Sequence, residues 1–288
     1  MVNTGLMKGN MVGSEIEGRQ MDTDLARQAA EILYQHRQAG TVLDTLPAAI
    51  RPESRAQGYH IQAMLEEDRA DKRVGWKIAA TSQAGQRHIG LTGPIAGRIL
   101  SSMVVPHAQT APFGHNHMRV AEAEFVFCVG RDIGPRTKPY SKDEVRAEIS
   151  SLHLGLEFPD SRFADFASAG EAQLIADNAC AHKFMMSPAI EDSWRDLDLS
   201  SHMVQGRVSG LTGQAEAEYE GVGANVLGCP YIAMTWLVNE LSAQNITLNE
   251  GEFVTTGTTT LPMAIQPGCL VSADFGRLGR IYCQLGRN

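Results

Sequence analysis

The first regular pattern of apolar positions along the chain has helical spacing. After Asp22 or Thr23, either of which can cap a helix, apolar residues recur every three or four positions until Gly40, a residue type common at helix C-termini. A second segment with the same spacing follows Pro52 and ends in a run of acidic residues. The pattern predicts two amphipathic helices, which form an N-terminal layer ahead of the main fold.

After Arg73 the spacing of apolar residues shortens toward two, which favours strands. The clearest strand runs from Met118 to Val129, with alanine and phenylalanine on one face and valine and glutamate on the other. Further strands are predicted over Val74–Ala79, Leu152–Phe158, Phe184–Met186, Val204–Ser209, Phe253–Thr256, Leu270–Asp274 and Arg280–Gln284. Helices are predicted from Ser82 toward His88, from Ser141 through Ile149 and over Pro230–Ala243.

Predicted strands outnumber predicted helices, and most links between strands are too short for a helical crossover. We therefore expect an α+β fold with a mixed or mainly antiparallel sheet, closed or stacked, and helices around it. Residues 1–21 are expected to be a flexible leader, residues 22–72 a helical region and residues 73–288 a β-rich catalytic domain.

Composition narrows the function classes. The formal net charge is −8 and the basic residues are scattered, so the sequence offers no basic stripe for nucleic acid. It has no apolar run long enough to cross a membrane and no basic-then-apolar segment typical of a secretion signal. The five cysteines lie far apart in apolar stretches, which favours reduced structural thiols over a nucleophile or a zinc site. We expect a cytoplasmic protein that binds neither nucleic acid nor membrane.

The main chemical signal is the pair Glu122 and Glu124 inside the apolar strand VAEAEFVFCV. Residues two apart share one face of a strand, so both carboxylates project to the same side. Burying two like charges is costly unless something positive lies between them, and a hard divalent cation such as Mg²⁺ or Mn²⁺ prefers oxygen ligands. Glu157, the one acid of the strand Leu152–Phe158, is the best candidate for a third ligand. The alternative is a solvated pair on an edge strand.

Lys77 lies in the middle of a strand, between Trp76 and Ile78. Lysine is rarely fully buried without a partner, so a buried Lys77 would have a carboxylate or a substrate anion beside it. The alternative is a surface lysine whose stem covers apolar side chains while its ammonium group stays in water.

Two other groups of polar residues give weaker signals. The alternating acids at Glu216, Glu218 and Glu220 have small or polar neighbours, which is typical of a solvated strand face. His115 and His117 are spaced as a zinc pair could be, but they lie in a loop that contains proline and glycine and have no clear third ligand. Neither group is expected to form the site.

A series of short motifs occurs in a familiar order. They are Gly75-Trp76-Lys77-Ile78, Thr81-Ser82, Glu122-x-Glu124-x-x-Phe127, Gly155-Leu156-Glu157, Asp160-Ser161-Arg162, Asp177-Asn178-Ala179, Gly223-Ala224-x-Val226-Leu227-Gly228-x-Pro230, Trp236-Leu237-x-Asn239 and Thr256-Gly257-Thr258. Together these motifs resemble the 2-keto-4-pentenoate hydratase group of the fumarylacetoacetate hydrolase superfamily. The resemblance extends over most of the chain.

This resemblance implies a mixed β-roll or barrel-like core with peripheral helices and an N-terminal helical layer. It implies a Mg²⁺ or Mn²⁺ ion held by Glu122, Glu124 and Glu157, with Lys77 as the catalytic residue beside the substrate. Ser161 and Thr258 match positions expected to bind substrate. A homo-oligomer is expected.

The resemblance also implies a reaction. Hydratases of the group convert 2-hydroxy-2,4-dienoates to 4-hydroxy-2-oxo acids in the catabolism of aromatic compounds, so this is the expected activity, on a small 2-oxo or 2-hydroxydienoic acid. Decarboxylation of 4-oxalocrotonate and hydrolysis of acylpyruvates are alternatives within the superfamily, and a non-catalytic binder of 2-oxo acids is a further one. One departure bears on the choice, since hydratases tend to carry an acidic loop where this chain has Leu91–Gly97.

Overall fold

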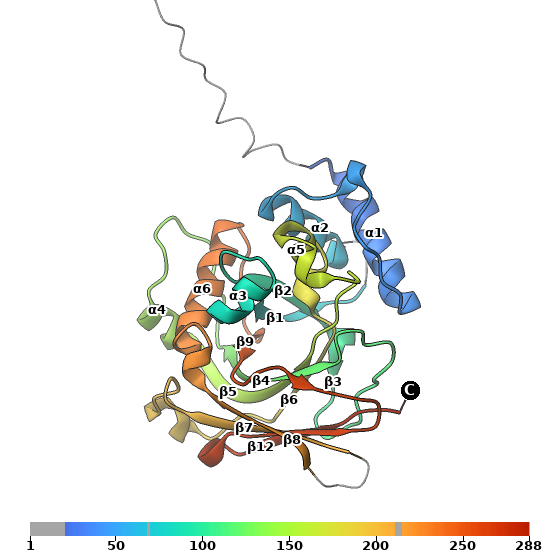
Figure 1. Cartoon of the computed structure of the whole chain (residues 1–288). Coiled ribbons are helices and arrows are strands. Elements are labelled where there is room, and N and C mark those ends of the chain that lie inside the picture. The colour runs from blue at the N-terminus through green and yellow to red at the C-terminus, as the bar shows by residue number, and fades with distance from the viewer. Residues whose placement is uncertain (1–20, 68–69, 211–214, 288) are drawn as a thin grey trace, which may run out of the picture.

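The computed structural model describes residues 21–67, 70–210 and 215–287 (Figure 1). Apart from Met21, the predicted leader lies outside these residues. Two layers of strands form the lower part of the molecule in Figure 1, and most of the helices lie above them.

The two predicted N-terminal helices are confirmed. α1 (Thr23–Ala39) begins at Asp22, whose carboxylate accepts hydrogen bonds from backbone N–H groups of the first turn, and ends at Gly40 in the left-handed conformation. α2 (Arg55–Glu67) packs against it through an apolar cluster that also contains Phe163. The helical layer therefore shares this cluster with the strand-rich part of the chain.

The larger sheet has eight strands and is mixed. Its order is β2-β1-β9-β4-β5-β6-β3, and β10 pairs with β4. β1 runs parallel to β9 and β3 parallel to β6, whereas the other pairs are antiparallel. The strands are β1 (Arg73–Ala79), β2 (Ile95–Leu100), β3 (Val104–Val105), β4 (Val120–Val129), β5 (Ile149–Phe158), β6 (Lys183–Met186), β9 (Phe253–Thr258) and β10 (Met263–Ala264).

A smaller antiparallel sheet, in the order β12-β11-β7-β8, packs against the larger one. Val204 and Val208 of β7 share a core cluster with Phe125 and Phe127 of β4. The alternation predicted for β4 is thus confirmed, because its alanine and phenylalanine face lies in the core between the sheets. The strands are β7 (Met203–Ser209), β8 (Ala215–Val222), β11 (Leu270–Asp274) and β12 (Arg280–Gln284).

Helices lie outside the sheets, as predicted. They are α3 (Gln83–His88), α4 (Lys142–Ala147), α5 (Glu171–Ala176) and α6 (Pro230–Ala243). Ser82 and Ser141 cap α3 and α4, as their sequence patterns predict, and α6 has its predicted bounds. The predicted extension of α4 through Ile149 is wrong, because Ile149 begins β5 and pairs with Val129.

Among the strands and α-helices, β2, β3, β10 and α5 were not predicted, and β3 and β10 have only two residues each. The chain enters β2 through Gly93 and Pro94, residue types that indicate a loop, yet the strand pairs with β1 along its length and every residue of it is buried. Tertiary pairing therefore decides this strand, rather than local propensity. α5 has only six residues, too few for a periodic signal. The predicted fold class, α+β with a mixed sheet and peripheral helices, is confirmed.

A left-handed turn, Asn178–Cys180, lies against β2. Its three residues have φ angles of 58°, 51° and 61°, a conformation that costs non-glycine residues about 1–3 kcal/mol each. The Asn178 side chain stabilises the turn, since its amide oxygen accepts from Arg98 N at 2.7 Å and its amide nitrogen donates to Arg98 O at 2.8 Å. Gly97 permits the close approach, because a Cβ at this position would lie 2.4 Å from the Asn178 carbonyl oxygen.

We predict that Gly97→Ala lowers the free energy of unfolding by about 1–3 kcal/mol, because the new methyl group meets backbone that cannot easily yield. Gly93→Ala is the matched control, since a Cβ there has no described heavy atom within 4 Å. Urea unfolding of the two variants measures the difference. Equal stabilities would contradict the close contact between β2 and the turn.

Candidate metal centre

Strands adjacent in the larger sheet bring the candidate residues to one face. In the order β1-β9-β4-β5, Lys77 lies on β1, Glu122 and Glu124 on β4 and Glu157 on β5. Glu122 is directly opposite Glu157 in the ladder, and Glu124 is two residues further along, so the carboxylates share a face. Figure 1 shows β4 and β5 as long curved strands. Although β9 and β4 lie between β1 and β5 in the sheet, Lys77 Nζ is 2.8 Å from Glu157 Oε1, and we attribute this close approach to the curvature of the sheet.

The three glutamates form a compact cluster. Each offers one carboxylate oxygen, and these oxygens lie within 4.8 Å of one another. Glu124 and Glu157 are 0% and 1% exposed, and Glu122 is partly buried. The alternative of a solvated edge pair is wrong, because β4 lies in the interior of the sheet, between β9 and β5. The described part of the chain contains no other group of three or more metal-ligating side chains this close together.

Glu124 is held through one of its two oxygens. Oε2 accepts hydrogen bonds from the Thr255 hydroxyl and, at 2.7 Å, from the backbone N–H of Gly257. Gly257 has a φ of 106°, and a Cβ there would lie 2.2 Å from the Thr81 hydroxyl oxygen, so only glycine suits this position. These two donors, on β9, were not predicted as part of the site. The motif Thr256-Gly257-Thr258 indicated that this segment belongs to the family pattern, but it did not predict the hydrogen bonds to Glu124.

Two buried carboxylate oxygens lack a hydrogen-bond partner among the described residues, Oε1 of Glu124 and Oε2 of Glu157. A buried charged oxygen without a partner is costly, and a cation would satisfy both. The donor set consists only of carboxylate oxygens, which suits a hard divalent ion rather than a soft one. The cluster therefore fits Mg²⁺ or Mn²⁺.

Lys77 is 2% exposed, so its interpretation as a surface lysine is wrong. Burial on its own would lower the pKa of Lys77, but the negative charges of Glu157 and Glu122 outweigh burial and raise that pKa above its ordinary value. The side chain therefore stays a cation in this environment. It neutralises part of the charge of the glutamates.

One lysine does not balance three carboxylates. Burial raises the pKa of Glu122 to about 7, with Lys77 opposing and Glu157 adding to the shift. Burial, reinforced by the charges of Glu157 and Glu122, raises the pKa of Glu124 well above its usual range. Without a bound cation the cluster thus tends to take up protons, and a cation competes with those protons for the same oxygens.

A cavity of about 630 Å³ opens beside the cluster. Three predicted site residues, Lys77, Glu122 and Thr258, line it, and Glu122 is the member of the glutamate cluster that reaches its wall. Ser161 does not line it within the described residues. Its hydroxyl donates to Asp177 at 2.8 Å, in the buried loop after β5. The substrate-binding roles of Ser161 and Thr258 stay predictions.

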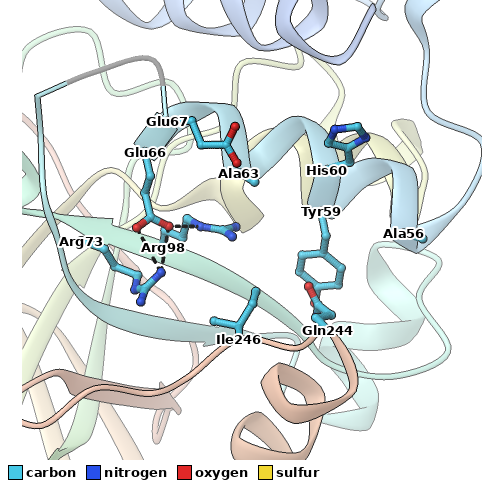
Figure 2. Close-up of a pocket in the computed structure, with 10 residues that line it drawn as sticks. All are labelled: Ala56, Tyr59, His60, Ala63, Glu66, Glu67, Arg73, Arg98, Gln244 and Ile246. Carbon is cyan, nitrogen blue, oxygen red and sulfur yellow. Dashed lines mark hydrogen bonds and ion pairs between the residues drawn. The ribbon is translucent and has the colours of Figure 1, made fainter. Parts of the chain in front are cut away.

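A second cavity, of about 470 Å³, lies apart from the cluster, between α2, the adjoining strands β1 and β2, and the chain after α6 (Figure 2). Its charged side chains are largely committed to one another. Figure 2 shows Glu66 between Arg73 and Arg98, and Arg73 also pairs with Glu252. With its arginines neutralised in this way, this cavity is the weaker candidate for an active site.

The weaker sequence signals do not join the cluster. The His117 ring contacts the carbonyl oxygen of Gly40 at 3.0 Å, and neither His115 nor His117 belongs to a metal-ligating group of described residues. Glu218 is exposed and pairs with Arg207, as expected of a solvated face. The side chain of Glu216 lies outside the described residues.

Glu220 gives a different result. It is exposed, as expected, yet it also lines the cavity beside the glutamate cluster, a placement that the sequence pattern did not indicate. The alternation of acids shows only that a strand face is polar, whereas the approach of β8 to the cavity depends on how the two sheets pack.

None of the five cysteines forms a disulfide bond. Burial, with the nearby charge of Asp177, raises the pKa of the Cys180 thiol to about 12, so this residue lines the cavity as a neutral group rather than as a nucleophile. No helix among the described residues combines the length and the apolar character that crossing a bilayer requires.

The family model of the fumarylacetoacetate (FAA) hydrolase C-terminal region matches residues 87–285. The chain belongs to the fumarylacetoacetate hydrolase family. The predicted membership is confirmed, and the matched region contains all three glutamates of the cluster.

Among the relatives of this fumarylacetoacetate hydrolase family member is a 2-keto-4-pentenoate hydratase from Paraburkholderia xenovorans (strain LB400). It is 28% identical over 264 residues, which cover 91% of this chain and 95% of the relative. A 4-oxalocrotonate decarboxylase from Pseudomonas sp. is 28% identical over 217 residues, 74% of this chain and 79% of the relative.

A solved structure shares the fold. The 4-oxalocrotonate decarboxylase from Pseudomonas putida G7, complexed with magnesium and adipate, has a TM-score of 0.81 to this chain at 23% identity. The match covers 93% of this chain and 100% of the other. The expected mixed β-roll with outer helices is thereby confirmed.

The raised pKa of Glu122 gives a prediction for the metal-free protein. A carboxyl group whose pKa is higher in the folded state stabilises the fold at low pH, and that contribution is lost as the pH rises through the folded pKa, here about 7. In EDTA, wild type should therefore lose up to about 2 kcal/mol relative to Glu122→Gln between pH 5 and pH 8. Chemical unfolding across this range measures it. If the difference in free energy of unfolding between wild type and Glu122→Gln stays constant over this range, the pKa of Glu122 is not raised.

Proposed function

We propose that this family member is a divalent-metal-dependent hydro-lyase that converts 2-hydroxy-2,4-dienoates to 4-hydroxy-2-oxo acids. The observation that carries the proposal is the cluster of Glu122, Glu124 and Glu157, with Lys77 beside it, at the wall of a substrate-sized cavity. The similarity to a 2-keto-4-pentenoate hydratase over nearly the whole chain supports the choice of reaction.

We propose Mg²⁺ or Mn²⁺ as the cofactor, held by the three glutamates. When bound, the ion would act as a Lewis acid toward the 2-oxo group and the adjacent carboxylate of the substrate. The magnesium in the related decarboxylase structure supports this assignment. The two unpartnered oxygens of Glu124 and Glu157 support it independently.

Lys77 is proposed as the catalytic residue. Its ammonium group, 2.8 Å from Glu157, places a positive charge at the cavity wall, where it can neutralise the substrate carboxylate. Thr255 and Gly257 keep Glu124 in place through its other oxygen. Ser161 and Thr258 remain proposed substrate-binding residues.

The proposed reaction adds one water molecule. A proton leaves the 2-hydroxyl group and another joins C5, which gives a 2-oxo-3-enoate in which C4 is electrophilic. Water then adds its hydroxyl group to C4 and its proton to C3. Loss of the 2-hydroxyl proton leaves an enolate as the intermediate. The apolar walls of the cavity exclude much of the bulk water around it, which strengthens the attraction between the enolate and the ammonium group of Lys77.

Decarboxylation of a 2-oxo-3-enedioate is the second candidate, because two of the relatives described above are 4-oxalocrotonate decarboxylases. It would use the same enolate, with CO₂ leaving instead of water adding, so the metal ligands do not separate the two reactions. Hydrolysis of acylpyruvates is the third. A role in aromatic catabolism, a cytoplasmic location and a homo-oligomeric state are proposed from the resemblance and remain to be tested.

Glutamine at any of the three ligand positions should weaken metal binding. Each change removes a full negative charge and leaves a neutral amide oxygen, which is a poorer ligand for a hard dication. Wild type should melt at a higher temperature as Mg²⁺ or Mn²⁺ is added, since the ion binds the folded state, whereas Glu122→Gln, Glu124→Gln and Glu157→Gln should gain less. Thermal melting across a metal titration measures this.

The metal-free variants provide the control. Because three clustered carboxylates repel one another, one glutamine should leave the metal-free protein as stable as wild type or slightly more stable. Glu218→Gln, at an exposed ion pair, should respond to metal as wild type does. If the melting temperature of wild type does not change as metal is added up to millimolar concentrations, these glutamates are not the metal site.

Product analysis tests the reaction itself. With metal present, a 2-hydroxy-2,4-dienoate should yield a 4-hydroxy-2-oxo acid, and EDTA should abolish the yield. Release of CO₂ from 4-oxalocrotonate would favour the second candidate, and pyruvate formed together with a free acid would favour acylpyruvate hydrolysis. If neither the 2-hydroxy-2,4-dienoate nor 4-oxalocrotonate nor an acylpyruvate reacts, the interpretation as a non-catalytic binder of 2-oxo acids is favoured.

A further inference from the structure

The cavity beside the glutamate cluster is larger than a short 2-oxo acid needs. Its volume of about 630 Å³ has room for roughly 20 groups the size of water, whereas a five-carbon 2-oxo acid has about eight non-hydrogen atoms. With the carboxylate and oxo groups at the glutamate cluster, more than half of the space remains for the other end of the substrate. The lining of that space therefore selects the substrate tail.

Most of the lining is apolar. It includes Ile89 at the end of α3, Phe166 and Leu174 near α5, and Met118 and Val120 at the start of β4. These side chains, supplied by separate parts of the chain, provide contacts for a hydrocarbon tail.

Positive charge is scarce in the lining. Among the described lining residues, Lys77 is the one lysine and no arginine occurs, and the ammonium of Lys77 is already paired with Glu157. His88 is the other side chain that can become positive, and it is exposed, with its ring edge-on to Phe166 at 6.2 Å. A second substrate carboxylate in this cavity would thus be desolvated without a strong partner.

Glu220 adds a negative charge to the same wall. It is the lining acid outside the glutamate cluster, and it comes from β8 of the smaller sheet. A carboxylate at the far end of a substrate would be repelled by it, whereas a neutral tail would not.

We propose that the substrate is a monocarboxylic 2-oxo or 2-hydroxydienoic acid whose uncharged, apolar tail is longer than the vinyl group of a five-carbon 2-hydroxy-2,4-dienoate. We also propose that Glu220 helps to exclude dicarboxylic analogues. This inference rests on the proposed function, because it assumes that the 2-oxo acid end binds at the glutamate cluster. It also disfavours the decarboxylase alternative, whose substrate carries a second carboxylate.

The first test compares two ligands of equal chain length, 2-oxohexanoate and 2-oxoadipate, by calorimetric titration into the Mg²⁺-loaded protein. 2-Oxohexanoate should bind at least about tenfold more tightly, because 2-oxoadipate must desolvate a second carboxylate. Equal affinities, or tighter binding of 2-oxoadipate through His88 or another group, would overturn the proposal.

Two variants test the part assigned to Glu220. Glu220→Gln should reduce the ratio of the dissociation constants of 2-oxoadipate and 2-oxohexanoate about threefold, because it removes the charge that repels the second carboxylate. Glu218→Gln is the matched control, since Glu218 lies two residues earlier on the same strand face, pairs with Arg207 and does not line the cavity. An equal effect of both variants would show that Glu220 acts only through the general charge of the surface.

Turnover separates this proposal from the proposed function. Dienoates with a 5-alkyl tail and with a 5-carboxymethyl tail are compared under the same conditions. Preference for the alkyl tail supports both proposals, and equal turnover of the two overturns only the proposal about the tail. If neither dienoate reacts although 2-oxohexanoate binds more tightly, the proposed reaction fails and the tail preference stands.

Discussion

The repulsion among three buried carboxylates is the constraint to which the rest of this structure responds. Glu122, Glu124 and Glu157 occupy interior strand positions that would be occupied more cheaply by apolar residues, and the one cation beside them, Lys77, compensates only part of their charge. Such a local conflict persists only where the surrounding fold fixes the groups and where it serves a function. A divalent cation held by the three carboxylates would resolve it.

The fold fixes these groups through strand register. A slip of one residue between β4 and β5 would turn the glutamates to the other face of their strands, into the apolar core between the sheets. The turn Asn178–Cys180 accepts an unfavourable backbone conformation beside the same cavity. Gly257 meets a similar demand without strain, because glycine adopts a positive φ freely.

The glutamate cluster and the far walls of the cavity come from different parts of the fold. The glutamates and Lys77 come from the larger sheet, and under the proposed function they would provide the chemistry that hydration, decarboxylation and C–C hydrolysis have in common. The far walls of the cavity come from α3, from the region of α5 and from β8, none of which carries a glutamate of the cluster. Relatives of this chain are named for different reactions, and one fold can host several of them when the residues that select the substrate lie apart from those that do the chemistry.

Much of this protein could be predicted from its sequence, because the relevant signals are local. The caps at Asp22, Ser82 and Ser141 and the alternation in β4 predicted their elements, and the spacing of Glu122 and Glu124 placed two carboxylates on one face. The strand patterns also singled out Glu157 and Lys77, and the order of the motifs added the roles expected of them and the family. These signals depend on residues a few positions apart, where backbone geometry alone determines which side chains are neighbours.

Only the tertiary structure decided which distant segments meet. β2 is a strand because β1 pairs with it, although its own sequence begins like a loop, and Glu220 lines the cavity because the smaller sheet packs close to it. The hydrogen bonds from Thr255 and Gly257 to Glu124, and the burial of Lys77, likewise arise from contacts between residues far apart in the chain. A periodic pattern records which face of an element is apolar, but it does not record which element covers that face, because the covering residues can lie anywhere in the sequence.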